Sequence, residues 1–525
     1  MPLSALSIPN ERSAPPKDLE IRPKQVKAWI ESLPLAQGMD AGKKLLVHLG
    51  AVNRSKVDLD NRLQILDLYR PITATLFEEF DAIYGKSALP LGPRAKDALA
   101  LARELAAELS AGYKIALSEK TGKIIAFGAK KQLPLLVLRA IEYLALVQRA
   151  SYKSYAPVPI GVWKELHTLY LFAEKEGVAA EPTDPETKTT VTEAYTETLL
   201  LSLTDPYRLV QGEADKIIAQ IRGTRAPVTL GQKRPETRPG GHFLVQCDQD
   251  RPPKPMLSVN EDKGGPNWRL FDANAVVDKL RTRKQAMETG NVSATTSKAL
   301  GPDGLSLLAR LLQLWGDPPK RAYRRDPMET SVALCVGLKA VSHFVTATSK
   351  MDPMAEAEAI REGITIPLLA VPDDEAAKAH PVFEWDVVNQ SEGGLKVRRV
   401  ASTQPIGVGD VIGIKAIGKP HWTVGVVRWI NVLDDGAMEF GLQFFAPAAA
   451  AVWIQPTISA NPQAKQGLLL ADGKDLPGEA LLAPPNTYAD LREFEIQADD
   501  TVSRVRAAAL IEKNARFELF HVSPS

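Results

Sequence analysis

The chain has 525 residues, more than a single hydrophobic core usually organises, so we expect about three or four domains. Lys and Arg number 64 against 63 Asp and Glu, a formal net charge of +1, whereas proteins whose main partner is nucleic acid usually carry a clear basic excess. The two cysteines, Cys247 and Cys335, lie far apart without a CxxC pattern. This argues against a zinc site or a disulfide framework and fits a reducing compartment.

The first part of the chain, residues 19–224, repeats the apolar spacing of amphipathic helices. After Pro23, apolar side chains recur at intervals of three and four residues, at Val26, Trp29, Ile30 and Leu33. Similar patterns continue to the end of this part, and almost nothing in it alternates like a strand. We therefore predict an all-α domain, either an irregular bundle or a helical repeat array, although no clean repeat period is found.

The sequence gives no indication of a membrane segment. Residues 1–18 are polar and contain prolines, so we expect a disordered lead, and they lack the basic start and apolar core of a signal peptide. The most apolar stretch, residues 133–146, is interrupted by Arg139 and Glu142 and is too short and too charged to span a bilayer. We expect a cytoplasmic protein with no membrane insertion.

Residues 225–318 connect the helical part to a region of different periodicity. Residues 225–241 are rich in proline and glycine, which is typical of a linker. Residues 242–318 contain short strand-like runs followed by helical patterns, and we predict a small mixed α/β segment there.

Residues 319–450 show an apolar period of two instead of the helical period. The alternating runs include residues 332–336, 383–387 and 440–444. Because they are short and separated by glycine-containing turns, they predict an antiparallel β-barrel, interrupted by an insertion at residues 346–381. Further short runs in residues 451–525 predict a second, smaller β module. The expected fold class is therefore multidomain α+β.

Two polar motifs accompany the predicted barrel strands. Arg321 and Arg325 form an Arg-x-x-x-Arg spacing in RAYRR, just before the first alternating run. Asn389, Ser391 and Gly394 belong to NQSEGG, an Asn-x-Ser-x-x-Gly pattern between two later runs. The strand sequences GVVRW and GLQF follow. Each motif alone is weak, and it is their order and their positions beside strand patterns that make the combination informative.

In this order the motifs resemble those of the PilZ domain family. The resemblance implies a β-barrel in a bacterial signalling effector that binds cyclic di-GMP. It also implies that Arg321 and Arg325 clamp guanine and phosphate, while residues of the second motif line the other side of the ligand. The ligand-binding residues that it implies are Arg321, Arg324, Arg325, Asn389, Ser391, Gly393 and Gly394.

The chemistry of these side chains suits such a ligand. A planar guanidinium group meets the O6 and N7 acceptors of guanine in a bidentate fashion, and it forms charge-assisted hydrogen bonds with phosphate oxygens. Asn389 and Ser391 could add short polar contacts from a turn, and Gly393 and Gly394 leave room for a close backbone approach. Tyr323 and Arg324 could add stacking contacts.

Two features depart from the family pattern. The insertion at residues 346–381 lengthens the interval between the motifs, and it could act as a lid or block the site. Glu392 lies inside the second motif and Asp326 follows Arg325, so two carboxylates stand close to the expected position of a dianion.

Three functional hypotheses remain open at this stage. The first is an effector in which cyclic di-GMP controls the binding of a partner protein by the helical domain. The second is a degenerate PilZ scaffold that acts in protein interaction or as a chaperone without nucleotide. An enzyme is the weakest, because the sequence lacks HExxH, GxSxG and Walker motifs and its histidines are scattered, so we expect no catalytic residue, metal or cofactor.

Overall fold

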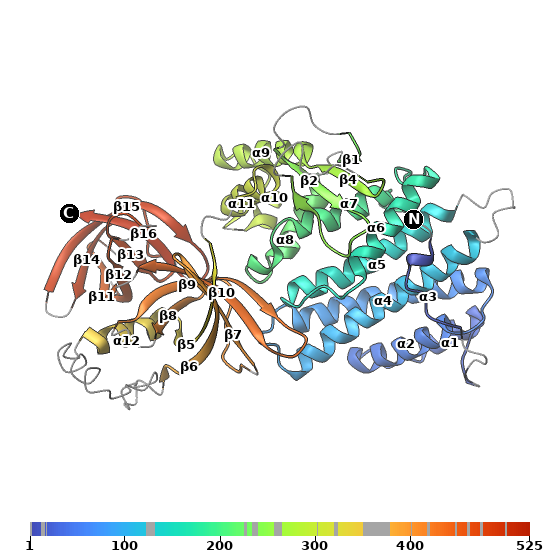
Figure 1. Cartoon of the computed structure of the whole chain (residues 1–525), viewed down its shortest axis with the longest axis horizontal. Coiled ribbons are helices and arrows are strands. Elements are labelled where there is room, and N and C mark those ends of the chain that lie inside the picture. Colours follow the sequence, from blue (N-terminus) through green and yellow to red (C-terminus); the bar gives the residue numbers. More distant parts are fainter. Residues whose placement is uncertain are drawn as a thin grey trace. The chain divides into compact units, whose positions relative to one another are not determined.

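The computed structural model describes residues 3–11, 16, 18–121, 132–224, 228–233, 240–256, 265–301, 303–319, 324–349, 379–400, 402–416, 421–446, 449–458, 463–472, 476–498 and 501–525. The chain divides into two compact units, one of residues 1–87 and 91–320 and one of residues 88–90 and 321–525. Figure 1 shows the first unit in blue to yellow-green and the second mainly in yellow to red.

The first unit is built mainly from helices. They are η1 (Leu3–Ala5), α1 (Pro23–Glu31), α2 (Gly38–Asn53), α3 (Leu59–Tyr84), α4 (Pro93–Thr121), α5 (Leu133–Lys153), α6 (Val162–Glu176), α7 (Val191–Ser202), η3 (Pro206–Arg208) and α8 (Glu213–Thr224). The starts of two helices follow from local sequence. The Asp58 side chain accepts a hydrogen bond from the Asn61 amide at the start of α3, and Thr190 and Glu193 form a capping box at the start of α7.

Part of the predicted disordered lead, residues 1–18, is ordered. Leu6 is buried, and the Ser7 amide donates a hydrogen bond of 2.5 Å to Oε1 of Glu165 on α6. The buried ammonium of Lys114 also contacts this carboxylate, at 2.8 Å. One apolar side chain and one backbone donor therefore hold this part of the lead against the helices.

The mixed segment predicted at residues 242–318 packs with the helices of the first unit. Its strands β2 (His242–Gln246), β3 (Lys254–Pro255) and β4 (Trp268–Asp272) form a sheet with β1 (Thr229–Gly231), in the order β1-β4-β2-β3. The helices that follow are α9 (Asn274–Glu288), α10 (Ala294–Leu300) and α11 (Gly304–Gly316).

Specific polar contacts attach this sheet to the helical bundle. The Asp250 carboxylate accepts hydrogen bonds from the amides of Gly161 and Lys164, at 2.6 and 3.0 Å, and thereby caps the start of α6. Arg269 on β4 forms an ion pair with Glu174 on α6. Sheet and bundle therefore form a single body.

The second unit contains two closed antiparallel barrels of six strands each. The first barrel has the strand order β10-β7-β6-β5-β8-β9 and the second the order β11-β12-β13-β16-β15-β14. The strands are β5 (Asp326–Val336), β6 (Val382–Ser391), β7 (Gly394–Arg399), β8 (Val411–Ala416), β9 (Thr423–Val432), β10 (Met438–Ala446), β11 (Ala449–Pro456), β12 (Lys465–Leu470), β13 (Ala480–Ala483), β14 (Glu493–Ala498), β15 (Thr501–Lys513) and β16 (Glu518–Pro524).

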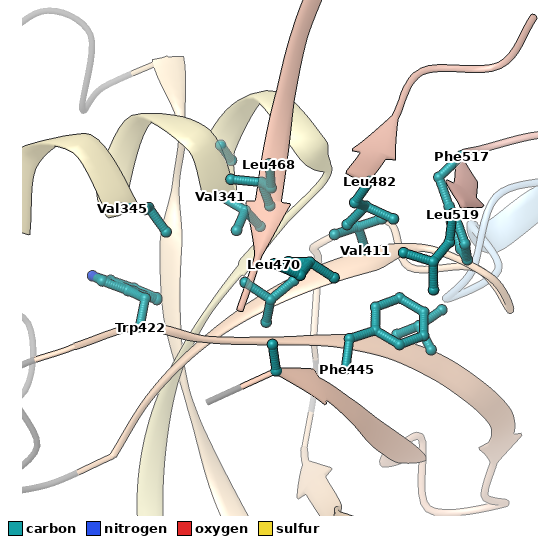
Figure 2. Close-up of a cluster of buried hydrophobic side chains, with 14 of the residues drawn as sticks. Val341, Val345, Val411, Trp422, Phe445, Leu468, Leu470, Leu482, Phe517 and Leu519 are labelled. Carbon is teal, nitrogen blue, oxygen red and sulfur yellow. The ribbon is translucent and has the colours of Figure 1, made fainter. Parts of the chain in front are cut away.

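A shared hydrophobic core joins the two barrels. Figure 2 shows Val411, Trp422 and Phe445 of the first barrel beside Leu468, Leu470 and Leu519 of the second. Helix α12 (Leu338–Ser349) adds buried side chains to the same cluster, including Phe344, which stacks on Trp422 with ring centroids 5.0 Å apart. The barrels are therefore one packed body, and the rest of the predicted insertion, residues 350–378, lies outside the described residues.

Burial on β5 explains why its alternation is weak in the sequence. Val332 and Leu334 are buried as predicted, but the smaller Ala333 and Cys335 on the opposite face are buried as well. Both of these small residues belong to the core that the barrels share. This second half of β5 is covered on both faces, so no polar side chain alternates with its larger apolar residues.

The predicted fold class, a helical N-terminal part followed by an antiparallel barrel and a further β module, is confirmed. The further module is a complete six-stranded barrel. In the described part of the chain, every helix is too short or too polar to cross a bilayer.

Candidate functional site

The second polar motif lies on the hairpin that connects β6 to β7. Ser391 ends β6 and pairs with Gly394, the first residue of β7. The Ser391 hydroxyl donates a hydrogen bond of 3.3 Å to the Gly394 carbonyl, across the turn of Glu392 and Gly393. Asn389 is half-buried two residues before Ser391, so the strand pleat places both side chains on the same face.

The barrel itself requires a glycine at position 394 of this motif. A Cβ atom on Gly394 would lie 1.9 Å from the carbonyl oxygen of Leu442 on β10. The Gly393 carbonyl accepts a hydrogen bond of 3.0 Å from the amide of Phe444 on the same strand. The close backbone approach expected at these glycines is therefore made, in part, by the neighbouring strand.

The first motif lies next to the second at the start of β5. Arg321 and Tyr323 fall outside the described residues, whereas Arg324 and Arg325 are described and exposed. Strand β5 pairs with β6 so that Asp326 lies opposite Gln390 and Pro327 opposite Asn389. This register brings the end of the first motif beside the second.

A cavity of about 540 Å³ lies at this junction. Its lining residues are Arg324, Asp326, Pro327, Met328, Gln390, Ser391 and Glu392. The Arg324 side chain is 91% exposed, and its Nε lies 3.4 Å from Oδ1 of Asp326. The structure thus brings Arg324 and Ser391 to one cavity, together with the two carboxylates that the sequence places near the ligand.

Three residues that sequence reasoning did not assign to the site continue a row across the barrel from the predicted Asn389. Asn389 pairs with Lys396 on β7, Lys396 with Gly441 on β10, and Gly441 with Trp429 on β9. Residues paired directly across strands share one face, so these four lie in a line.

Contacts within this row fix its shape. A Cβ atom on Gly441 would lie 1.9 Å from Nε1 of Trp429, so the indole ring covers the glycine. The Lys396 ammonium lies 6.0 Å from the centroid of this ring and 2.8 Å from Oε2 of Glu439. Trp429 is half-buried, in contrast to Trp422, which is in the core. The signal in the sequence was the GVVRW strand, but only the strand register places its tryptophan beside Asn389.

Together these groups offer a guanidinium, an amide, a hydroxyl, an ammonium and an indole surface. Such a set can hydrogen-bond the edge of a base, pair with phosphate oxygens and stack on an aromatic ring. No group of three potential metal-ligating side chains occurs within the described ranges of the chain.

Comparison with known proteins relates most of the chain to one kind of receptor. Residues 24–233 match the family model described as cyclic-di-GMP receptor FimW, N-terminal domain. Residues 242–366 and 368–451 match the model described as cyclic-di-GMP receptor FimW, middle PilZ domain. A curated relative, the cyclic-di-GMP receptor FimW of Pseudomonas aeruginosa, is 23% identical over 490 residues, which cover 82% of this chain and 78% of the relative. These matches confirm the resemblance to the PilZ family and extend the relationship to the helical part.

Proposed function

Residues 242–366 and 368–451 belong to the PilZ family, and from this premise we propose that the chain is a cyclic di-GMP receptor whose nucleotide site controls partner binding by the helical unit. The observation that supports the proposal most strongly is the shared cavity. Arg324 from the first motif and Ser391 from the second line it together, because Asp326 and Gln390 pair at the same level of the sheet.

In this proposal the ligand lies on the β5–β6 edge of the cavity and extends along the row from Asn389 to Trp429. Arg321 and Arg325 meet a guanine edge and a phosphate, and Arg324 contributes a further cation. Asn389 and Ser391 add hydrogen bonds, and the face of the Trp429 indole stacks on a base. Lys396 increases the positive potential beside the ring.

The position of the first motif in the chain suggests how binding is transmitted. The division between the two units falls between Lys320 and Arg321, so the clamp arginines stand at the start of the second unit. A ligand that fixes this segment to the barrel also constrains the connection to the helical unit. In the proposed signalling role, this constraint changes how the helical unit binds its partner.

The two cysteines are free, which is in keeping with a cytoplasmic location.

The alternative is a degenerate PilZ scaffold that acts only through protein contacts. The observation in its favour is that Asp326 and Glu392 line the same cavity as Arg324. Two carboxylates next to a dianion weaken its binding unless arginines offset their charge.

Calorimetric titration of the full chain with cyclic di-GMP tests the proposal. Wild type is expected to bind, and the Arg321→Ala/Arg325→Ala variant to lose more than about a hundredfold in affinity, because each charge-assisted contact contributes roughly 1.5–3 kcal/mol. The matched control is Arg504→Ala/Arg506→Ala on β15, where both arginines form exposed ion pairs with Glu495 and Glu493. Absence of binding by wild type, or equal losses in the two double variants, contradicts the proposal and favours the scaffold.

A further inference from the structure

The first unit contains a groove that neither the sequence motifs nor the nucleotide site explain. Its volume is about 1130 Å³. One face of α3 forms a wall, α5 lines the base, and α8 and residues 184–186 form the opposite wall. Ala102 of α4, the helix that packs against both α3 and α5, contributes a small side chain to the base.

The groove has the dimensions of a peptide site. On α3, its lining residues extend from Asp67 to Tyr84, which corresponds to about 25 Å of helix. Its volume exceeds that of most pockets for drug-sized ligands, which reach about 1,000 Å³. Apolar side chains line it along its length: Pro71, Ala74, Phe77, Tyr143, Leu146, Ala150, Ile218 and Ala219. A long groove between helices, in which apolar side chains alternate with charged ones, can receive an amphipathic helix.

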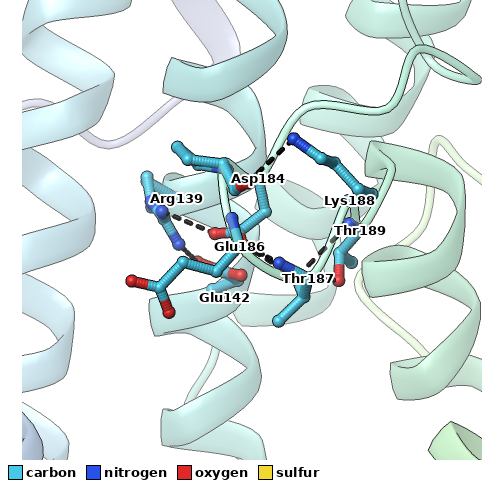
Figure 3. Close-up of polar contacts among 8 residues, drawn as sticks. Arg139, Glu142, Asp184, Glu186, Thr187, Lys188 and Thr189 are labelled. Atoms are coloured by element: carbon cyan, nitrogen blue, oxygen red, sulfur yellow. Dashed lines mark hydrogen bonds and ion pairs between the residues drawn. The ribbon is translucent and has the colours of Figure 1, made fainter.

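Ion pairs already hold most of the basic side chains in the groove. The Arg139 guanidinium forms ion pairs of 2.7 Å with the carboxylates of Asp184 and Glu142 (Figure 3). Lys153 lies 2.5 Å from Asp81 and 2.8 Å from Asp215. Arg149 and Arg222 share Glu197, at 3.1 and 2.6 Å.

The turn around Asp184 shows how firmly one wall is built. Its carboxylate accepts hydrogen bonds from the Glu186 amide and from the amide and hydroxyl of Thr187, in addition to Arg139 (Figure 3). Burial alone would raise the pKa of Asp184, but the hydrogen bonds from Thr187 and Arg139 lower it to about 2. This wall is therefore preorganised and does not depend on an incoming ligand.

Acidic side chains are in excess in the groove. The lining carboxylates are Asp67, Glu78, Asp81, Asp184, Glu186 and Asp215, one more than the lining basic groups, which are Arg70, Arg139, Arg149, Lys153 and Arg222. Glu142 and Glu197, which do not line the groove, pair with Arg139 and with Arg149 and Arg222. Glu78 and Glu186 are exposed, and neither forms an ion pair with a residue that the structure describes. The rim therefore keeps negative charge available to a ligand.

We propose that this groove binds a basic amphipathic helix of a partner protein. Apolar side chains of the partner would pack along Phe77, Leu146 and Ile218, and its Lys or Arg side chains would meet Glu78 and Glu186 at the rim. An anionic ligand is disfavoured because the basic side chains, apart from Arg70, are held by carboxylates.

Fluorescence anisotropy with two labelled synthetic peptides tests this inference on the full chain. One peptide is an amphipathic helix of about eighteen residues built from Leu, Ala and Lys, long enough to follow the groove. The other has Glu in place of each Lys. The basic peptide is expected to bind at least about tenfold more tightly, with an affinity that falls as salt is added.

Charge reversal at the rim locates the binding. Glu78→Lys/Glu186→Lys is expected to weaken the basic peptide about tenfold. The control is Glu79→Lys/Glu181→Lys, which changes exposed carboxylates on the same helix and the same connecting segment that do not line the groove. The control is expected to bind the peptide like wild type, and both variants to bind cyclic di-GMP unchanged, so this test is independent of the proposed receptor function.

Several results would overturn the inference. One is equal or absent binding of the two peptides, and another is an equal loss in both double variants. A third is self-association of wild type that Glu78→Lys/Glu186→Lys abolishes in size-exclusion chromatography, because a second copy of the chain would then occupy the groove.

Discussion

The two barrels of the second unit share a topology but differ in how they use their polar side chains. Both are closed, antiparallel and six-stranded, and they bury one common core. In the first barrel, Arg324, Gln390 and Glu392 stand exposed around a cavity at the β5–β6 edge. In the second barrel, the carboxylate of Glu518 is fully buried and accepts hydrogen bonds from the amides of Thr487 and Tyr488.

A closed six-stranded barrel therefore does not by itself determine a binding site. The cavity of the candidate site is formed by two short segments of the first barrel, namely the residues at the start of β5 and the hairpin between β6 and β7. In the second barrel, the buried Glu518 carboxylate binds the backbone amides of the loop at residues 487–488, and this contact stabilises the fold. Function therefore has to be argued from such segments and not from strand order.

A methyl group added to Gly394 would test how closely the hairpin of the candidate site packs against the rest of the first barrel. Gly394→Ala is expected to destabilise this barrel by about 3 kcal/mol, because the new Cβ would lie 1.9 Å from the Leu442 carbonyl oxygen. Hydrogen-exchange mass spectrometry of the full chain would show faster exchange in β7 and β10.

The matched change in the second barrel is Gly467→Ala. There the added Cβ would meet the end of the Ile454 side chain at 2.3 Å and a backbone oxygen only at 2.9 Å. A flexible side chain can move aside, so the expected loss is about 1 kcal/mol. Equal losses at the two glycines would show that the hairpin is not specially constrained.

The pH dependence of stability provides a second test of the comparison between the barrels, because the buried carboxyl of Glu518 belongs to the second barrel only. Burial alone would raise the pKa of this carboxyl, but hydrogen bonds from the Tyr488 and Thr487 amides and from Lys513 lower it. A lowered pKa means that the carboxylate stabilises the fold above the ordinary pKa of glutamate, and that this stabilisation is lost as the pH falls through the folded-state value.

Glu518→Gln is therefore expected to lower the free energy of unfolding by about 2 kcal/mol at neutral pH, with a smaller difference in acid. Chemical denaturation at several pH values measures this, with hydrogen exchange assigning the loss to the second barrel. A difference that stays constant with pH would mean that the charge of Glu518 does not stabilise the barrel.

The sequence predicts the first barrel better than the second for a physical reason. In the first barrel, runs such as residues 383–387 alternate because Trp385 and Val387 are buried while Glu384 and Asp386 are exposed. In the second barrel, β15 (Thr501–Lys513) is mostly exposed and carries Arg, Ala and Ser, so its period of two is hidden. A strand that buries few side chains gives little signal, although pairing with β14 and β16 completes the barrel.

Contacts between distant segments were beyond sequence reasoning. Asp250 caps the start of α6 although it lies 89 residues after Gly161 in the sequence, and the sequence near Gly161 does not indicate that Asp250 is its partner. The row from Asn389 to Trp429 depends on register in three strand pairs, and a shift of one residue would turn its side chains to the other face. The order of the motifs was sufficient to predict the PilZ relationship, whereas the indole and ammonium beside Asn389 required the structure.

The smallest expected effect concerns two tryptophans of the second unit, the half-buried Trp429 and the exposed Trp453. Trp429 lies beside Lys396 in the row that begins at Asn389, whereas Trp453 on β11 is 50% exposed on the second barrel. If a guanine base stacks on Trp429, Trp429→Leu is expected to weaken cyclic di-GMP about tenfold, since stacking on an aromatic ring contributes about 1–3 kcal/mol per base.

Trp453→Leu removes an equally large ring from the same unit and is expected to leave the affinity unchanged. Calorimetry on both variants, with thermal unfolding to confirm that each is folded, measures the difference. A loss of affinity in Trp429→Leu alone extends the candidate site from the cavity across β7 and β10. Unchanged affinity in both variants would confine the ligand to the β5–β6 edge and leave Trp429 as a cover for Gly441, where its indole already replaces the side chain that the glycine lacks.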